Sequence, residues 1–273
     1  MPKCWARILG DCAGPITKEH IVTERVFPEK TVTVRGLPWC REEYKTISIV
    51  NYKASILCEK HNNALSPVDD AGILFADRLR GMVKIHRERS SLISRAGWSQ
   101  PFYVYDYSFN GPLLERWFLK TLINYEMVGK QHIPIGPKGT VGEPPKELVE
   151  VAFGRQKFDA PTGLYLIARR GDVLGFDDRI HYTSLIAMSD DREFIGGGRF
   201  NFHGLELALF LGGQKIPRVY NSPDGPREVM RHPRQFDVNI GEGRPSQRMY
   251  FDWTSKVLPS FPIDKLMTLI ERD

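Results

Sequence analysis

A thiol, an imidazole and two amides lie close together in the segment ILCEKHNNALS, residues 56–66. The side chains are Cys58, His61, Asn62 and Asn63, and a packed core does not need this mixture. Thiolate and imidazole are zinc ligands, and the C-x-x-H spacing lets Cys58 and His61 reach one ion from a single turn. The segment therefore predicts a metal site.

The remaining cysteines lie near the start of the chain. Cys4, Cys12, Cys40 and Cys58 are the only cysteines, and all fall in the first quarter of the 273 residues. In a reducing compartment, cysteines are more often metal ligands or buried thiols than disulfides. Cys4 and Cys12 together with Cys58 and His61 predict a closed tetrahedral structural zinc (Zn²⁺) site. Cys40 is an alternative to Cys12, and the interpretation without metal is four buried thiols and an unrelated histidine.

A second polar group precedes this pair of ligands. The segment TKEHIV places Glu19 beside His20, about forty residues before Cys58. With this pair and with C-x-x-HNNALSPVDD, residues 4 to about 70 resemble the HNH endonucleases. Those enzymes carry a carboxylate–histidine pair near the first strand of a ββα-metal finger, and an Asn or His in its closing helix. The resemblance matches these positions to Glu19, His20 and Asn62.

The resemblance implies metal-dependent hydrolysis of phosphodiester bonds in nucleic acid, with DNA more usual than RNA. Glu19 and Asn62 would hold a catalytic divalent ion, Mg²⁺ or Mn²⁺, because hard ions prefer oxygen ligands. His20 would take the proton from an attacking water as general base. Asn63 is the alternative ligand if the helix begins one residue later, whereas the start of a helix explains Asp69.

A different class of function is also compatible with these residues. The alternative is a non-catalytic zinc-finger module that binds nucleic acid or a protein partner. The middle Asn of the family pattern would fall near Lys53, and its absence favours this alternative. Activity in the C-terminal part ranks last, because residues 100–273 contain no nucleophile–base pair that the sequence identifies.

The basic excess of the chain coincides with the cysteines. The net charge is +5, and residues 1–100 hold 16 Lys and Arg against 11 Asp and Glu, whereas the rest holds 22 against 22. This distribution is typical of a unit that meets phosphates. No apolar run approaches the roughly 20 residues that span a bilayer, and the start of the chain lacks the apolar region of a secretory signal. We therefore expect a cytoplasmic protein without a membrane partner.

The predicted elements indicate an α+β fold in two domains. Residues 1–95 would form the HNH-like domain with a trailing helix, and residues 96–273 an α+β domain of unknown role. A homo-oligomer or a regulatory partner that binds through this second domain is left open. In the first domain the patterns predict strands at 31–34 and 46–50, the start of a helix within 56–65, and a helix from Ser66 to about residue 88.

The second domain follows a Ser- and Gly-containing link at 88–101. Its patterns predict a strand at 101–109, a helix at 112–128, a Pro/Gly loop at 133–145, strands within 163–170, 181–188, 192–202 and 205–213, a hairpin turn at 189–193 and a closing helix at 262–272. The Arg-rich region 215–250 is interpreted as a solvated face, because acidic residues dilute its charge.

Overall fold

The computed structural model describes most of the chain between Cys4 and Thr254. The described residues are 4–35, 37–96, 105–129, 133–168, 180–189, 192–202, 204–213, 215–222, 225–239 and 245–254. They form a mixed fold of helices and strands, in agreement with the predicted α+β class. No helix in these ranges is long and apolar enough to cross a membrane.

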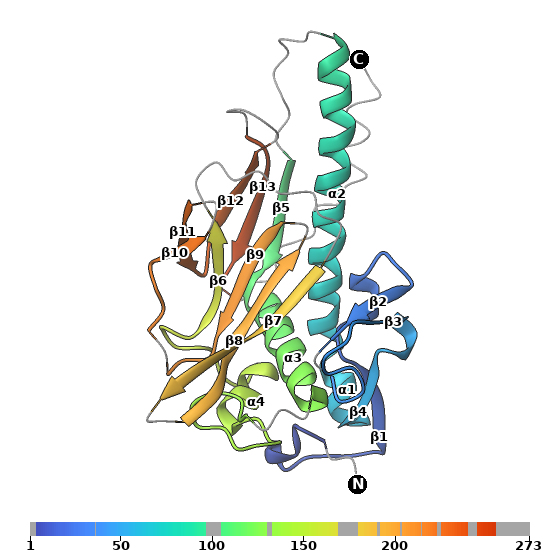
Figure 1. Ribbon diagram of the computed structural model, residues 1–273, viewed down its shortest axis with the longest axis vertical. Coiled ribbons are helices and arrows are strands. Elements are labelled where there is room, and N and C mark those ends of the chain that lie inside the picture. The colour runs from blue at the N-terminus through green and yellow to red at the C-terminus, as the bar shows by residue number, and fades with distance from the viewer. Residues whose placement is uncertain are drawn as a thin grey trace.

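The N-terminal elements are built around one antiparallel pair of strands. β1 (Ile16–His20) pairs with β4 (Lys53–Cys58), and α1 (Glu59–Ala64) follows β4 directly (Figure 1). Between them, β2 (Thr31–Val34) and β3 (Lys45–Ser48) form a second antiparallel pair. Short 3-10 helices are Arg7–Leu9, Glu24–Val26 and Ile49–Asn51.

These elements confirm some of the predicted boundaries and correct others. The strand at 31–34 is confirmed, whereas the strand predicted at 46–50 gives way to a 3-10 helix from Ile49. The helix predicted to start within 56–65 is confirmed, and it begins at Glu59 as α1. Residues 56–58 belong to β4, because Leu57 and Cys58 pair with Thr17 and Ile16 of β1. This long-range pairing is invisible in the local pattern.

Two helices link the N-terminal elements to the rest of the fold. α2 (Ser66–Ala96) begins where predicted but continues past residue 88 through most of the expected link. α3 (Gly111–Gly129) confirms the helix predicted at 112–128. The buried ring of Phe75 on α2 contacts Phe118 on α3 and Phe202 on the sheet, with ring centroids 6.2 and 5.7 Å apart. The core is therefore continuous across the two predicted domains, and their boundary at residues 95 and 96 stays a prediction.

The second half of the chain is rich in strands. Six of them form an antiparallel sheet in the order β10-β11-β6-β9-β8-β7, and three form a sheet in the order β12-β13-β5, with β13 parallel to β5. α3 packs against the larger sheet and also against β4, so it lies between the sheet and the N-terminal elements (Figure 1). The bounds are β5 (Tyr105–Asn110), α4 (Lys146–Ala152), β6 (Gly163–Ala168), β7 (Ile180–Ser189), β8 (Arg192–Phe202), β9 (Leu205–Phe210), β10 (Val219–Ser222), β11 (Gly225–Arg231), β12 (Gln235–Asn239) and β13 (Pro245–Asp252).

The predicted strands of this half are confirmed as β6 to β9, and β5 confirms the end of the strand predicted at 101–109. β7 and β8 pair as a hairpin, as the turn predicted at 189–193 requires. The interpretation of 215–250 as a solvated face missed four strands, β10 to β13. The residues of β11 alternate between half-buried and exposed positions, but two of the half-buried positions hold Arg227 and Arg231, which hid the strand pattern. The closing helix at 262–272 lies outside the described residues.

The contact between α2 and α3 depends on one glycine. A Cβ built on Gly72 of α2 would lie 2.3 Å from the indole of Trp117 on α3. Trp117 is fully buried, and its Nε1 donates a hydrogen bond of 2.9 Å to the hydroxyl of Thr23. Glycine at this position therefore allows the close approach of the two helices that carry Asp69 and Lys120 (described below).

We expect Gly72→Ala to lower the free energy of unfolding by about 1–3 kcal/mol, the usual cost of overpacking a core contact. Gly81→Ala, on the same helix, is the matched control, because a Cβ at Gly81 meets nothing within 4 Å. Alanine there should be neutral or stabilising by up to about 1 kcal/mol through helix propensity. Urea unfolding of both variants measures the difference, and equal effects would contradict the proposed close contact.

Candidate metal centre and its polar network

Four predicted ligands come together at one point. The Sγ atoms of Cys4, Cys12 and Cys58 and the Nδ1 atom of His61 all lie within 4.8 Å of one another. Nδ1 is 3.3 Å from Cys4 Sγ, 3.6 Å from Cys12 Sγ and 3.2 Å from Cys58 Sγ. Ligands held around one tetrahedral zinc by bonds of about 2.0–2.3 Å are separated by roughly 3.3–3.8 Å. The donor types and their spacing therefore fit a zinc ion.

Backbone hydrogen bonds bring the two pairs of ligands together. The Trp5 N–H donates to the Ile56 carbonyl at 3.0 Å, which places Cys4 beside the end of β4. The N–H of Lys60, in the first turn of α1, donates to the Ala13 carbonyl at 3.2 Å, next to Cys12. In the described part of the chain the group includes Cys12 and leaves out Cys40, whose N–H donates to Leu37 in the loop between β2 and β3. Cys12, rather than its alternative Cys40, therefore completes the set.

An aspartate orients the imidazole of this group. Nε2 of His61 lies 2.9 Å from Oδ1 of Asp11, and Asp11 also pairs with Lys60 at 2.9 Å and with Arg155 at 3.1 Å. These partners hold the pKa of Asp11 well below its usual value, Lys60 first and His61 next. An ionised carboxylate accepts, so Nε2 carries the proton and the lone pair of Nδ1 faces the three sulfurs. Sequence reasoning missed Asp11, although its place beside Cys12 was a usable signal.

The thiols of the group have unequal environments. Burial raises the pKa of the Cys4 thiol to about 12. Burial also acts to raise the pKa of Cys58, but hydrogen bonds from the backbone N–H groups of His61 and Ala13 outweigh it and leave that pKa below its ordinary value. Metal binding requires thiolates and releases their protons. A cation at this point would therefore remove the cost of burying the Cys4 sulfur as an anion.

We expect the purified protein to carry about one zinc per chain, and Cys58→Ser to lose the metal and several kcal/mol of stability, because binding energy of a structural zinc is folding energy. Cys40→Ser is the matched control, since Cys40 is also buried but lies outside the group. Metal content by mass spectrometry and thermal unfolding measure both effects. Full zinc content in Cys58→Ser would exclude this site.

We expect Asp11→Asn to weaken zinc binding about 10- to 100-fold, the usual effect of removing a carboxylate that orients a ligand histidine. Lys60→Gln is the control, because it removes a different partner of Asp11 and leaves the contact with His61. Competition with a chromophoric chelator gives the affinities. An unchanged affinity in Asp11→Asn would mean that the carboxylate does not orient the ligand.

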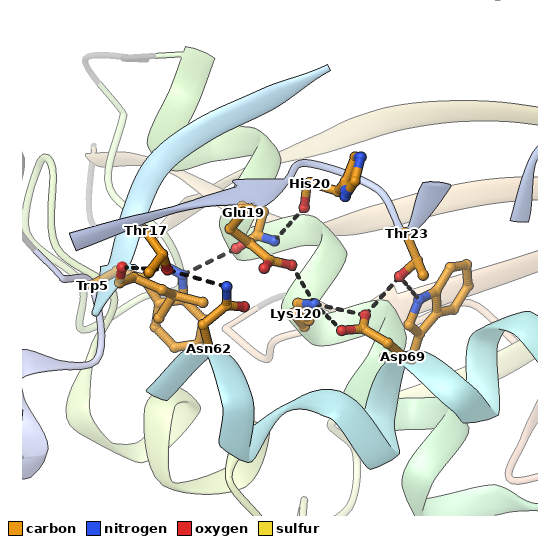
Figure 2. Close-up of polar contacts among 11 residues, drawn as sticks. Trp5, Thr17, Glu19, His20, Thr23, Asn62, Asp69 and Lys120 are labelled. Carbon is orange, nitrogen blue, oxygen red and sulfur yellow. Dashed lines mark hydrogen bonds and ion pairs between the residues drawn. The ribbon is translucent and has the colours of Figure 1, made fainter. Parts of the chain in front are cut away.

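The carboxylate–histidine pair of β1 divides between two faces of the strand. Neighbouring residues of a strand point to opposite sides, and the carboxylate of Glu19 is buried whereas His20 is half-buried. The imidazole of His20 points away from the Glu19 carboxylate (Figure 2), and its Nε2 lies 2.9 Å from a carboxylate oxygen of Glu24. Burial and the nearby charge of Lys53 lower the pKa of His20. The imidazole is therefore neutral near pH 7.

Asn62 lies on the same side as Glu19. Its Nδ2 donates to the Thr17 hydroxyl at 3.1 Å, and that hydroxyl donates in turn to the Leu57 carbonyl at 3.2 Å. Because the hydroxyl hydrogen is already used, Asn62 must present its N–H groups to Thr17. Asn62 is also a hydrogen-bond partner that lowers the pKa of Glu19. In this arrangement Asn62 supports the Glu19 carboxylate as a donor, while the alternative ligand Asn63 is exposed.

A lysine from α3 fills the space beside Glu19. Nζ of Lys120 lies 2.5 Å from Glu19 Oε1 and donates to both carboxylate oxygens of Asp69, at 2.6 and 2.7 Å (Figure 2). The Lys120 side chain is only 2% exposed. Burial raises the pKa of Glu19, and the charge and hydrogen bond of Lys120 oppose that rise. Asp69 stands in the first turn of α2, as predicted, but it is also a partner of this ion pair.

Lys120 could not be found from the sequence, because it lies about a hundred residues from Glu19 and belongs to no motif. Its position decides what the acidic pair can hold in this state. The ammonium already occupies the point between Glu19 and Asp69, so these residues do not offer an open site to a Mg²⁺ or Mn²⁺ ion. The predicted catalytic ion therefore does not fit the arrangement as it stands.

Comparisons with known proteins add no further assignment. A scan against models of protein families, a search of curated proteins and a search of solved structures found no match to the chain.

Proposed function

We propose that the chain is a metal-dependent HNH-type endonuclease that hydrolyses phosphodiester bonds, with DNA as substrate. The observation that carries the proposal is the order of elements around the ligand group. β1, its antiparallel partner β4 and the helix α1 that follows supply Glu19, His20, Cys58, His61 and Asn62 from one compact unit. The proposal takes this order, with β2 and β3 inserted between β1 and β4, as a variant of the two strands and helix that the resemblance to the HNH family implies.

In this proposal the zinc is structural. All four ligands are protein side chains, which leaves no open position for a water or a substrate. The centre would tie the segment from Cys4 to Cys12 to the junction of β4 and α1. It would thereby fix the start of α1, and with it the position of Asn62 next to Glu19.

His20 is the general base of the proposed reaction. Its lowered pKa leaves the imidazole neutral and able to accept a proton. A carboxylate oxygen of Glu24 lies 2.9 Å from Nε2 of His20, but the geometry does not make a hydrogen bond, and Nε2 is buried. In this proposal Nδ1 would take the proton from the attacking water. A divalent ion supplies charge stabilisation at the phosphate in enzymes of this type.

Exposed aromatic and basic side chains suit a nucleic-acid partner. Trp39 is 43% exposed and Tyr44 is 72% exposed, and both lie in the segment that joins β2 to β3. The guanidinium of Arg35 lies over the ring of Tyr44 at 5.3 Å. Aromatic rings can stack on bases and cations can meet phosphates. These residues belong to the insertion between β1 and β4, the two strands that carry the candidate site.

Two observations favour a non-catalytic zinc module as the second candidate. Lys120 already neutralises the carboxylate of Glu19, and the imidazole of His20 points away from it toward Glu24. A finger that only binds nucleic acid or a protein would use Glu19 to anchor α3, and it would have no need of a general base.

We expect the wild-type protein to nick supercoiled plasmid with Mg²⁺ or Mn²⁺ and to lose this activity with EDTA. His20→Ala should cleave about 10²- to 10⁴-fold more slowly, the usual contribution of a general base, with unchanged zinc content and melting temperature. His181→Ala is the matched control, because His181 is an exposed histidine on β7.

Equal cleavage by wild type and His20→Ala would exclude His20 as the base. Nucleic-acid binding without cleavage by any of the proteins, at all metal concentrations tested, would favour the non-catalytic module. Loss of zinc or of the fold in His20→Ala would show that the histidine is structural.

A further inference from the structure

Arginine side chains gather on the face of the six-stranded sheet that is turned away from α3. Alternate residues of β9 belong to the main core, so Glu206 between them points to the opposite face. The strand register puts Arg199 of β8 on the same face as Glu206. It also puts Arg227 and Arg231 of β11 there. Arg218, just before β10, lies at the border of this surface, which we call the arginine face.

The register separates these arginines from the acidic residues that lie near them in the sequence. Glu228 follows Arg227 directly in β11, so the two side chains point to opposite sides of the sheet. In β6, β9, β10 and β11, Glu206 and Glu228 are the only acidic residues. Of these two, Glu206 alone lies on the arginine face. The mixed charge of the Arg-rich region in the sequence therefore resolves into a basic face in the fold.

The arginine face carries more positive charge than its carboxylate can neutralise. The side chain of Glu206 is 2% exposed and pairs with Arg199 and, at 3.1 Å, with Arg227. One carboxylate against two guanidinium groups leaves one positive charge in excess. Arg231 adds another, because it donates to two backbone carbonyls, which are uncharged. Arg218 is exposed and has no ion pair within the described part of the chain. The surplus favours an anionic partner.

The sheet curves toward the arginine face. Nη1 of Arg199 on β8 donates to the hydroxyl of Tyr220 on β10 at 3.3 Å, and the guanidinium lies 5.1 Å from the centre of that ring. In the strand order, β9, β6 and β11 separate β8 from β10. In a flat sheet the two strands would be about 19 Å apart, at about 4.8 Å per strand. Their side chains meet because the sheet bends, which makes the arginine face concave.

Aromatic rings accompany the arginines on this concave face. Tyr220 and Phe210 are half-buried, and the ring of Phe210 contacts Tyr165 with centroids 5.1 Å apart. Guanidinium groups bind phosphates, and aromatic rings stack on bases, which a single strand exposes and a duplex hides. We propose that the arginine face binds single-stranded nucleic acid, with phosphates at Arg199 and Arg218 and bases at Tyr220 and Phe210.

This binding role goes beyond the proposed function. It concerns the part of the chain that the resemblance to the HNH family does not cover, and it does not require cleavage. If the arginines served only to neutralise Glu206 and to hold the sheet curved, Arg218 would contribute nothing, because it lies outside that network. A binding face instead needs Arg218 and the ring of Tyr220.

The test is fluorescence anisotropy of a labelled oligothymidylate of about 20 nucleotides, enough for one site of this kind, titrated with the full chain. The buffer contains no Mg²⁺ or Mn²⁺, so the proposed nuclease cannot act. We expect Arg218→Gln to bind about 3- to 10-fold more weakly and to lower the salt dependence by about one phosphate contact. Lys146→Gln is the control, because it removes an equal charge from an exposed side chain on α4.

A second probe separates stacking from charge. Tyr220→Ser should bind the oligothymidylate about 5- to 100-fold more weakly, the usual loss when one stacked base is released. An oligomer of abasic deoxyribose phosphates with the same length keeps the phosphates and lacks the bases. Tyr220→Ser should bind this oligomer as wild type does, whereas Arg218→Gln should bind it more weakly.

Three outcomes would overturn the inference: no binding of the oligothymidylate by the wild-type chain, tighter binding of a duplex of the same length, or an Arg218→Gln variant that binds as tightly as Lys146→Gln. If Tyr220→Ser does not fold, Arg218→Gln still decides, since that side chain is exposed. Binding that Arg218→Gln weakens, without cleavage of plasmid in Mg²⁺, would keep the arginine face and reject the proposed nuclease. Cleavage with unchanged binding in Arg218→Gln would do the reverse.

Discussion

The arrangement of the N-terminal elements depends on one meeting point of four side chains. Three sulfurs and one imidazole nitrogen from two segments, 4–12 and 58–61, lie within 4.8 Å of one another, and three of the four residues are buried. Thiols gathered in this way gain little from burial alone, whereas a cation with affinity for sulfur stabilises them strongly. The meeting point fixes the segment from Cys4 to Cys12 against the junction of β4 and α1. Through Asp11, which pairs with Arg155, it also contacts the part of the chain that follows α4.

The register of β1 against β4 then determines which side chains can cooperate. Glu19 pairs with Ala54, and His20 pairs with Lys53. The side chain of Glu19 points toward Asn62 of α1, Asp69 of α2 and Lys120 of α3, whereas the imidazole of His20 turns away from Lys120. The site is therefore shared between the N-terminal elements and α3. Lys120 pairs with the Glu19 carboxylate, and Asn124 donates a hydrogen bond to the His20 carbonyl. Neither residue belongs to the segment that resembles the HNH family. A division of the chain at residue 95 places Glu19 and His20 in the first predicted domain and Lys120 and Asn124 in the second.

One half of the ligand group, Cys58 and His61, could be predicted because its information is local. Cys58 and His61 are three residues apart, and thiol and imidazole side chains have few other reasons to stand together. Asn62 comes close to Glu19 through the pairing of β1 with β4, which the local strand patterns did not predict. Lys120 and Glu24 could not be assigned roles, because a lysine in an amphipathic helix and a glutamate near a turn are ordinary surface residues in a sequence. Only the close packing of α3 on β1 buries Lys120 and turns it into a counter-ion. The strands of 219–252 were missed for a related reason, since charged residues occupy many of their positions and neighbouring strands decide their pairing.

Zinc K-edge X-ray absorption of the purified protein tests the account most directly, because it reports the atoms bound to the metal itself. The account predicts about one zinc per chain with three sulfur ligands at about 2.3 Å and one nitrogen ligand at about 2.0 Å. In Cys58→Ser this signature should disappear. A first shell made of oxygen and nitrogen alone, or a folded protein without zinc, would contradict the claim that Cys4, Cys12, Cys58 and His61 form the metal centre that organises this part of the fold.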